Sequence, residues 1–400
     1  MEINKRDFLA IDDLSLLEIE AIFSLAAQME ETPSRYLSLC RNRIMASLFF
    51  EPSTRTRLSF ETAMHRLGGE VITVSEAGTS SLAKGESLTD TARVIGSYAD
   101  MIVVRHPWEG AARVFAEYAP VSVINAGDGG HQHPTQTLCD LYIIKKERGR
   151  IKGLNVALCG DLKNARAVHS LAYGLAMFGA NIICAPGTTG LDMPPYVLTR
   201  LNREYGYVAI SPALSDLKFL NKELDILYLI PGKAIQPSKG DELVEKIDVL
   251  YVTRVQKERF NTAVERPLSY PVVNKKTLAE AKFRETLVMH PLPRVDELSP
   301  EVDTDPRAIY FKQAASGVPV RMALIAFLLR AEEFFIKEGL PQKKKEILPG
   351  GEGRTCSNRN CVAFKERDFL SPKFEIISPE PLRLKCVYCE HLFPSTFCLT

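Results

Sequence analysis

The run from Phe50 to Arg57 holds the densest group of side chains that could do chemistry. Its hydroxyl and guanidinium side chains belong to Ser53, Thr54, Arg55, Thr56 and Arg57. An apolar segment precedes the run and helical spacing follows it, so we expect a turn from a strand into a helix. Helix N-terminal N–H groups, joined by these donors, suit a bound phosphate. In the alternative, Ser53 merely caps the helix and the arginines are solvated, which leaves the density of anion donors unexplained.

Two other predicted strand ends carry histidines. One holds Arg105-His106-Pro107, and the other leads through a glycine-rich loop to His133 and Gln136. Pro134 can begin a helix, and this placement lets His133 and Gln136 face the same crevice. A lone histidine is more often structural than catalytic. Because both loops lie at ends of predicted parallel strands, we favour a functional His133.

Four cysteines near the C-terminus form two close pairs. They are Cys356, Cys361, Cys386 and Cys389. Four thiolates at this spacing, separated by a stretch that could form small antiparallel strands, suit tetrahedral zinc. His391 could replace one ligand, and Cys398 is expected to be spare. Disulfides are the competing interpretation, but the sequence lacks a secretory signal, so reduced thiols are expected.

The elements that must position these side chains alternate along the chain. Apolar positions at three- and four-residue steps predict a helix over Leu16–Met29. Branched and aromatic runs predict strands at 44–50, 71–74, 101–104 and 121–124, and a second series at 155–159, 181–184, 208–210, 225–229, 248–252 and 286–289. A helix predicted at 134–148 separates the two series. Parallel βαβ units, and hence an α/β fold with doubly wound parallel sheets, explain this order.

The composition is that of an ordinary globular protein, with 46% hydrophobic and 25% charged residues among 400. The 50 basic residues nearly balance the 49 acidic ones, so any anion site must be local. The N-terminus lacks the basic-then-apolar order of a signal peptide, and the longest apolar stretch, Met322–Leu329, is too short to span a bilayer. We expect a cytoplasmic protein without a nucleic-acid or membrane partner.

In the order and spacing of its motifs, the sequence resembles the aspartate/ornithine carbamoyltransferase family from the N-terminus to about Ile336. The motifs are Ser53-Thr54-Arg55-Thr56-Arg57, Arg105-His106-Pro107, His133-Pro134-Thr135-Gln136, Gly160-Asp161-Leu162-Lys163 with Arg166, the segment 253–259, and His290-Pro291-Leu292-Pro293-Arg294. The resemblance implies transfer of the carbamoyl group of carbamoyl phosphate to an amine. Ornithine specificity would call for a His-Cys-Leu-Pro motif and an acidic Ser-Met-Gly loop. The sequences at 290–293 and 253–256 differ from these, which implies an acidic acceptor, L-aspartate.

Carried onto this chain, the resemblance implies a role for each motif residue. The phosphate would be held by Ser53, Thr54, Arg55 and Thr56, and the carbamoyl oxygen by Thr56, Arg105 and His133. The carbamoyl amide would be held by Gln136 and the carbonyls of Pro291 and Leu292. The aspartate would be held by Arg166, Arg254 and Gln256. Of these, Arg55, Thr56, Arg105 and His133 are the implied catalytic residues. Donors fixed at the oxygen where charge develops stabilise a tetrahedral intermediate, and the leaving phosphate can take the amine proton.

A polar loop at residues 79–86 resembles one that family members insert into a neighbouring subunit's site. Ser81 and Lys84 would then contact carbamoyl phosphate there, and Lys84 would also contact aspartate. One chain could not complete its own site, so the implied active unit is a homotrimer, or a pair of trimers with shared sites. The alternative is a mobile surface loop.

The resemblance also implies the division into domains. These are a carbamoyl-phosphate-binding domain at 1–134 completed by a helix at 317–338, an aspartate-binding domain at 135–316, a linker at 339–353, and a zinc-binding, zinc-ribbon-like β domain at 354–400. The completing helix has amphipathic spacing from Val318 to Ile336. The tail resembles the zinc domain of the family's regulatory chain, here fused. Too few residues precede it to hold that chain's nucleotide-binding domain, so we expect a structural or assembly role without nucleotide control.

The sequence departs from the family pattern at a few positions, and other functions are compatible with parts of it. His131 and Asn164-Ala165 stand where the family more often has an asparagine and an aromatic-glycine pair, so they bear on fine geometry. A zinc-ribbon adaptor on an inactive scaffold is an alternative, against which the retained ligand positions argue. A nucleic-acid-binding zinc ribbon would need clustered aromatic and basic residues that the tail lacks. A carbamoyltransferase for another amine is the nearest alternative enzyme.

Overall fold

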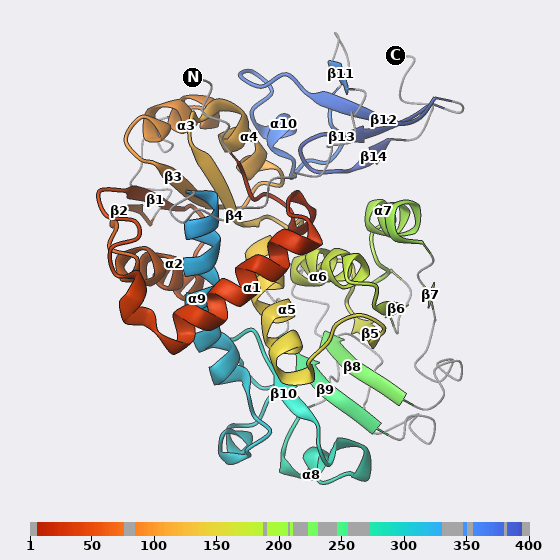
Figure 1. Cartoon of the computed structure of the whole chain (residues 1–400). Coiled ribbons are helices and arrows are strands. Elements are labelled where there is room, and N and C mark those ends of the chain that lie inside the picture. The colour runs from red at the N-terminus through yellow and green to blue at the C-terminus, as the bar shows by residue number, and fades with distance from the viewer. Residues whose placement is uncertain are drawn as a thin grey trace. The chain divides into compact units, whose positions relative to one another are not determined.

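The structure, a computed structural model, describes residues 6–75, 85–186, 190–206, 209–210, 223–230, 246–254, 272–329, 347–349, 355–379 and 382–393. The chain forms two compact units, one from Met1–Leu138 with Gly317–Thr400 and one from Cys139–Ser316. Each contains a parallel sheet, and the first also carries a small antiparallel sheet (Figure 1). The expected fold class is therefore confirmed. Within the described ranges, no helix combines the length and apolar character needed to cross a membrane.

Four parallel strands form the sheet of the first unit, in the order β2-β1-β3-β4. Their bounds are β1 Ile44–Phe49, β2 Glu70–Val74, β3 Met101–His106 and β4 Ser122–Asp128. All four match strands predicted from the sequence. Phe49 of β1 pairs with Arg105 of β3, and His106 pairs with Asp128 of β4. The ends of three strands therefore lie in register at one edge of the sheet.

The helices of this unit begin at recognisable signals. They include α1 Leu16–Glu31, α2 Thr54–Arg66, α3 Leu88–Gly96 and α4 Ala111–Tyr118. At the start of α1, Oγ of Ser15 accepts a hydrogen bond from N–H of Glu18 at 3.3 Å, and Oε2 of Glu18 accepts one from N–H of Ser15 at 2.7 Å. This capping box satisfies two N–H groups that the helix leaves unpaired. The helix predicted at 16–29 is confirmed and extends to Glu31.

Two long helices span the division of the chain. The helix α5 has the predicted bounds, Pro134–Arg148, whereas α9 spans Tyr310–Leu328, so the expected start at Val318 is wrong. The turns before Pro319 are fixed by tertiary contacts: Tyr310 is fully buried, and its hydroxyl bonds to Asp303 and Arg294. Spacing alone could not reveal that anchor. The expected end of the helix lies outside the described residues.

Six parallel strands form the sheet of the second unit, in the order β10-β9-β8-β5-β6-β7. Their bounds are β5 Asn155–Gly160, β6 Asn181–Ala185, β7 Ala209–Ile210, β8 Glu223–Ile230, β9 Lys246–Val252 and β10 Leu287–Met289, and the helices are α6 Arg166–Met177, α7 Pro195–Tyr205 and α8 Lys275–Leu278. The described residues of β5, β8 and β9 are buried almost throughout, as expected for a parallel sheet covered on both faces. The second series of predicted strands is thus present.

The C-terminal segment is part of the first unit and shares a core with α3 and α4. It contains β11 Ile347–Pro349, α10 Val362–Lys365, β12 Lys373–Pro379, β13 Leu382–Cys386 and β14 Leu392–Phe393. The strands pair antiparallel in chain order. Phe374 and Tyr388 join one continuous apolar cluster with Ala92 of α3 and Phe115 of α4. A segment this short cannot bury a large core alone, so it depends on α3 and α4 for burial.

Candidate active site and metal centre

The turn predicted at residues 50–57 follows β1 and opens α2. Ser53 occupies the N-cap position, yet its hydroxyl makes no capping hydrogen bond. Thr54 and Arg55 are exposed, and Thr56 is buried. The first N–H groups of α2 and the positive end of its dipole lie beside these donors, an arrangement that suits an anion. The interpretation of Ser53 as a simple cap therefore has no support in the geometry.

Arg105 links the ends of three strands. Its Nη1 lies 3.4 Å from Nε2 of His133 and donates to the carbonyl oxygen of Ala126 at 3.5 Å. Its Nε lies 3.3 Å from Oε2 of Glu51. The structure thus brings the guanidinium of Arg105 and the imidazole of His133 together beside the turn that opens α2. Two donors held this way could act on one oxygen of a bound substrate.

The neighbouring His106 holds the turn after β3. Its Nδ1 accepts a hydrogen bond from N–H of Trp108 at 3.0 Å, and its ring packs edge-on against Phe50 and Trp108. Burial lowers the pKa of His106 to about 4, although Asp128 and Glu51 act in the opposite direction. The imidazole is therefore neutral at pH 7 and fits a structural role.

The loop between β4 and α5 presents His133 and is held by buried charges. Nδ1 of His131 lies 2.9 Å from Oδ2 of Asp128, and Nε2 lies 3.3 Å from Oε2 of Glu390, a residue of the C-terminal segment. Burial alone lowers the pKa of His131, but these two carboxylates raise it to about 10. A charged imidazole buried between two carboxylates fixes the loop immediately before His133.

The two arginines expected to hold aspartate lie at one edge of the second sheet. Arg166 is buried at the start of α6, after β5, and Arg254 is half-buried just after β9. Only β8 separates β5 from β9, so the two strands lie about 10 Å apart. The carboxyl ends of parallel strands are the usual ligand edge of such a sheet.

The segment after β10 has a rigid support. N–H of Leu292 donates to Nδ1 of His290 at 2.8 Å, and Nε2 of His290 lies 2.8 Å from Oε1 of the fully buried Glu297. Burial raises the pKa of the Glu297 carboxyl, but the hydrogen bond from His290 and backbone N–H groups lower it on balance. Pro291 and Leu292 are half-buried, and Leu292 adopts a left-handed conformation with φ 54°. Their carbonyls are thus carried on a fixed turn.

Three residues expected in the site, Ser81, Lys84 and Gln256, lie outside the described residues. Gln136 is half-buried in the first turn of α5, three positions after His133. Two residues beside the expected site were not predicted from the sequence: Glu51, which pairs with Arg105, and Glu390, which contacts His131. The sequence offered one signal for each: Glu51 directly precedes the Pro52-Ser53 turn, and Glu390 directly follows Cys389.

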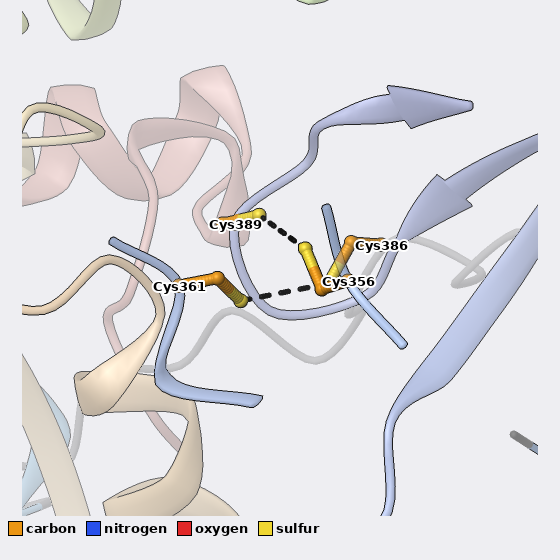
Figure 2. A group of neighbouring side chains, drawn as sticks. All are labelled: Cys356, Cys361, Cys386 and Cys389. Carbon is orange, nitrogen blue, oxygen red and sulfur yellow. Dashed lines mark hydrogen bonds between the residues drawn. The ribbon is translucent and has the colours of Figure 1, made fainter. Parts of the chain in front are cut away.

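The four expected cysteines meet in one buried cluster (Figure 2). Their sulfur atoms all lie within 4.8 Å of one another; Cys356 and Cys389 are 3.6 Å apart, and Cys361 and Cys386 are 3.8 Å apart. Tetrahedral zinc with bonds of about 2.3 Å places sulfurs about 3.8 Å apart, whereas a disulfide needs about 2.05 Å. The cluster therefore fits a four-thiolate metal site and not the competing disulfides. His391 is exposed and packs on Phe393 instead.

Comparisons with known proteins agree with this geometry. Residues 6–146 match the family model "Aspartate/ornithine carbamoyltransferase, carbamoyl-P binding domain", and residues 152–328 match "Aspartate/ornithine carbamoyltransferase, Asp/Orn binding domain". Residues 354–396 match "Aspartate carbamoyltransferase regulatory chain, metal binding domain". The chain thus joins parts that resemble a catalytic chain and a regulatory chain.

Among curated relatives, the aspartate carbamoyltransferase catalytic subunit of Thermococcus gammatolerans is 49% identical over 82% of this chain and 99% of its own length. That of Thermoplasma acidophilum is 46% identical over the same shares. The catalytic subunit of Methanocaldococcus jannaschii aspartate transcarbamoylase superposes with a TM-score of 0.65 at 44% identity, over 82% of this chain and 99% of that one. The Trypanosoma cruzi enzyme in complex with N-(phosphonacetyl)-L-aspartic acid gives a TM-score of 0.67 at 35% identity, over 81% and 96%. On this evidence, the chain belongs to the aspartate/ornithine carbamoyltransferase family.

Proposed function

We propose that this chain is an enzyme that transfers the carbamoyl group of carbamoyl phosphate to the amine of L-aspartate. The products are N-carbamoyl-L-aspartate and phosphate, which places the reaction in de novo pyrimidine biosynthesis. The observation that carries the proposal is the pairing of Arg105 with His133 beside the start of α2. It occurs in a chain that spans 99% of a relative named as an aspartate carbamoyltransferase catalytic subunit.

The phosphate of the substrate binds at the start of α2, where the helix N–H groups supply part of the anion site. The residues proposed to complete it are Ser53, Thr54, Arg55 and Thr56, with Ser81 and Lys84 from the polar segment at 79–86. The guanidinium and the positive helix end offset the charge of the dianion. Bound there, the phosphate is an activated leaving group.

The carbamoyl oxygen meets Thr56, Arg105 and His133. When the amine of aspartate attacks the carbonyl carbon, a C–N bond forms and negative charge develops on this oxygen. Donors already fixed at that position stabilise the tetrahedral intermediate, and losing one typically costs about 3 kcal/mol of barrier. The C–O bond to phosphate then breaks, and the departing phosphate accepts the proton of the amine.

The remaining groups orient the two reactants. The carbonyl oxygens of Pro291 and Leu292 accept hydrogen bonds from the carbamoyl amide, and the side chain of Gln136 bonds to the same amide. Arg166 and Arg254 bind the carboxylates of aspartate through forked N–H groups, supported by Gln256 and Lys84. Holding both reactants in line removes most of the entropic barrier to their encounter.

The test is phosphate release from carbamoyl phosphate by the purified chain, with and without L-aspartate. We expect aspartate-dependent turnover that is lost in Arg55→Ala and in Arg254→Ala. The matched controls are Arg66→Ala at the other end of α2 and Arg284→Ala in the second unit, both exposed. Turnover with ornithine, putrescine or N-acetylornithine in place of aspartate would correct the acceptor. If the protein folds but shows no turnover, the alternative function, a zinc-ribbon adaptor on an inactive scaffold, would be favoured.

The active unit we propose is a cytoplasmic homotrimer, or a pair of trimers, in which Ser81 and Lys84 act in the neighbouring subunit's site. Mixing Lys84→Ala with Arg55→Ala protein should then restore turnover, because some sites would receive both intact residues. Light scattering gives the mass of the assembly. Absence of restoration in re-formed mixed trimers would contradict sharing of sites.

The metal we propose for the four-cysteine cluster is zinc. Bound there, it would supply no chemistry to the transfer; it would hold the turns at 356–361 and 386–389 together. A bound metal that cross-links these turns would stabilise the fold of a domain too small to have a large core of its own.

A further inference from the structure

Glu390 of the C-terminal segment reaches the loop that carries His133. Its Oε2 lies 3.3 Å from Nε2 of His131 and accepts a hydrogen bond from Nε2 of Gln132 at 3.3 Å. All three side chains are buried, with Glu390 only 3% exposed. The two residues just before His133 are therefore both held by one carboxylate from the far end of the chain.

The other side of the loop is held by Asp128. Its Oδ2 accepts hydrogen bonds from N–H of Gly110 at 2.8 Å and from His131, and its Oδ1 accepts one from N–H of Gln132 at 3.1 Å. The imidazole of His131 thus lies between two carboxylates, one from β4 and one from the C-terminal segment. Removing either carboxylate takes a hydrogen-bond acceptor away from these buried donors, and each donor left unsatisfied costs about 1–3 kcal/mol.

Glu390 is itself held in a defined place. Its backbone has φ 61°, a left-handed conformation that costs a residue with a Cβ about 1–2 kcal/mol. N–H of Glu390 donates to the carbonyl oxygen of Cys386 at 3.0 Å, so the turn through the cysteine cluster imposes this conformation. Oε1 lies 3.7 Å from Arg113 and 3.8 Å from Lys385. One carboxylate oxygen of Glu390 therefore faces the two cations, and the other faces the loop that carries His133.

We propose that Glu390 is a positioning residue for carbamoyl transfer, which fixes the His133 loop through His131 and Gln132. The inference rests on the proposed function and adds a role in cis for the C-terminal domain. Because the contacts of Glu390 with the loop fall on His131 and Gln132, next to His133, we expect the effect to fall on the transfer step. Misplacing a group at the reacting oxygen by about 1 Å can lower the rate on the order of 100-fold.

The test compares Glu390→Gln with Glu375→Gln in the full chain. Glu375 is also a buried carboxylate of the C-terminal domain and pairs with Lys385 at 3.1 Å, so the control makes the same chemical change away from the loop. We expect Glu390→Gln to lower kcat on the order of 10- to 100-fold, with little change in KM for carbamoyl phosphate. Glu375→Gln should keep the wild-type kcat, and both variants should bind the wild-type amount of metal.

Two further variants separate positioning from folding. Glu390→Asp keeps the charge and should recover part of the lost kcat. His131→Asn leaves the C-terminal domain intact and should lower kcat by itself, and adding Glu390→Gln to it should cost less than in the wild-type chain, because the two act through one contact. If Glu390→Gln does not fold, the His131→Asn result decides alone.

Wild-type kcat in a folded Glu390→Gln or in His131→Asn would overturn the proposal, as would an equal loss in Glu375→Gln or fully additive losses in the double variant. These outcomes differ from a failure of the proposed function. In that case, the wild-type chain itself would show no aspartate-dependent release of phosphate.

Discussion

The guanidinium of Arg105 lies 3.4 Å from Nε2 of His133, although the two residues come from different strand ends. Because both donors would serve one oxygen, we predict that their losses are not independent. Arg105→Ala and His133→Ala should each lower kcat on the order of 100- to 1,000-fold, and the double variant should cost far less than the product. Phosphate release under saturating substrates measures each value. A multiplicative loss in the double variant would mean that the two side chains act separately.

The cysteine cluster predicts one metal ion per chain. Cys386→Ser should release the metal and lower the thermal midpoint, since a four-thiolate site contributes on the order of 10 kcal/mol to folding in small zinc domains. Elemental analysis and a melting curve measure both effects. Cys398→Ser, outside the described residues, is the matched thiol change and should leave both unchanged. Full metal content in Cys386→Ser would contradict the assignment of ligands.

His106 predicts a loss of stability in acid. Because burial lowers its pKa to about 4, the unfolded chain takes up a proton below the ordinary histidine pKa while the folded chain does not. Stability is therefore full above about pH 6.5 and falls as the pH drops toward 4. Between pH 7 and 4.5, the free energy of unfolding of His106→Asn should fall by on the order of 2–3 kcal/mol less than that of the wild-type chain.

Urea unfolding at the two pH values measures this difference. His65→Asn, a change to an exposed histidine on α2, is the control and should follow the wild-type curve. Equal acid sensitivity in wild type and His106→Asn would show that other groups dominate the acid response.

We predict that adding a side chain at Gly160 is strongly destabilising. This glycine ends β5, before the loop that leads to Arg166. A Cβ there would lie 1.8 Å from the carbonyl oxygen of Ile230 on β8, and the residue has φ 105°. Gly160→Ala should destabilise by more than about 3 kcal/mol and weaken aspartate binding. Gly179 has φ 75°, but its Cβ would meet nothing closer than 3.6 Å, so Gly179→Ala should cost only about 1–2 kcal/mol. Denaturation midpoints that fall equally in both would refute the steric argument.

Patterns in the sequence were enough to predict most of the helices and strands. Alternating apolar runs predicted the strands of both parallel sheets, and three- and four-residue spacing predicted α1 and α5, because burial of one face imposes a period on the side chains. The donors after β1 and the four cysteines were recognisable because anion and metal binding demand particular atoms at short spacing.

Contacts between groups far apart in the chain depend on tertiary packing. The start of α9 depends on the burial of Tyr310 against Arg294 and Asp303, which helical spacing does not report. The contact between His131 and Glu390 joins residues 259 positions apart. Local propensity and periodicity act over a few residues, whereas such a contact exists only after the sheet edge and the cysteine turns have packed around the same core.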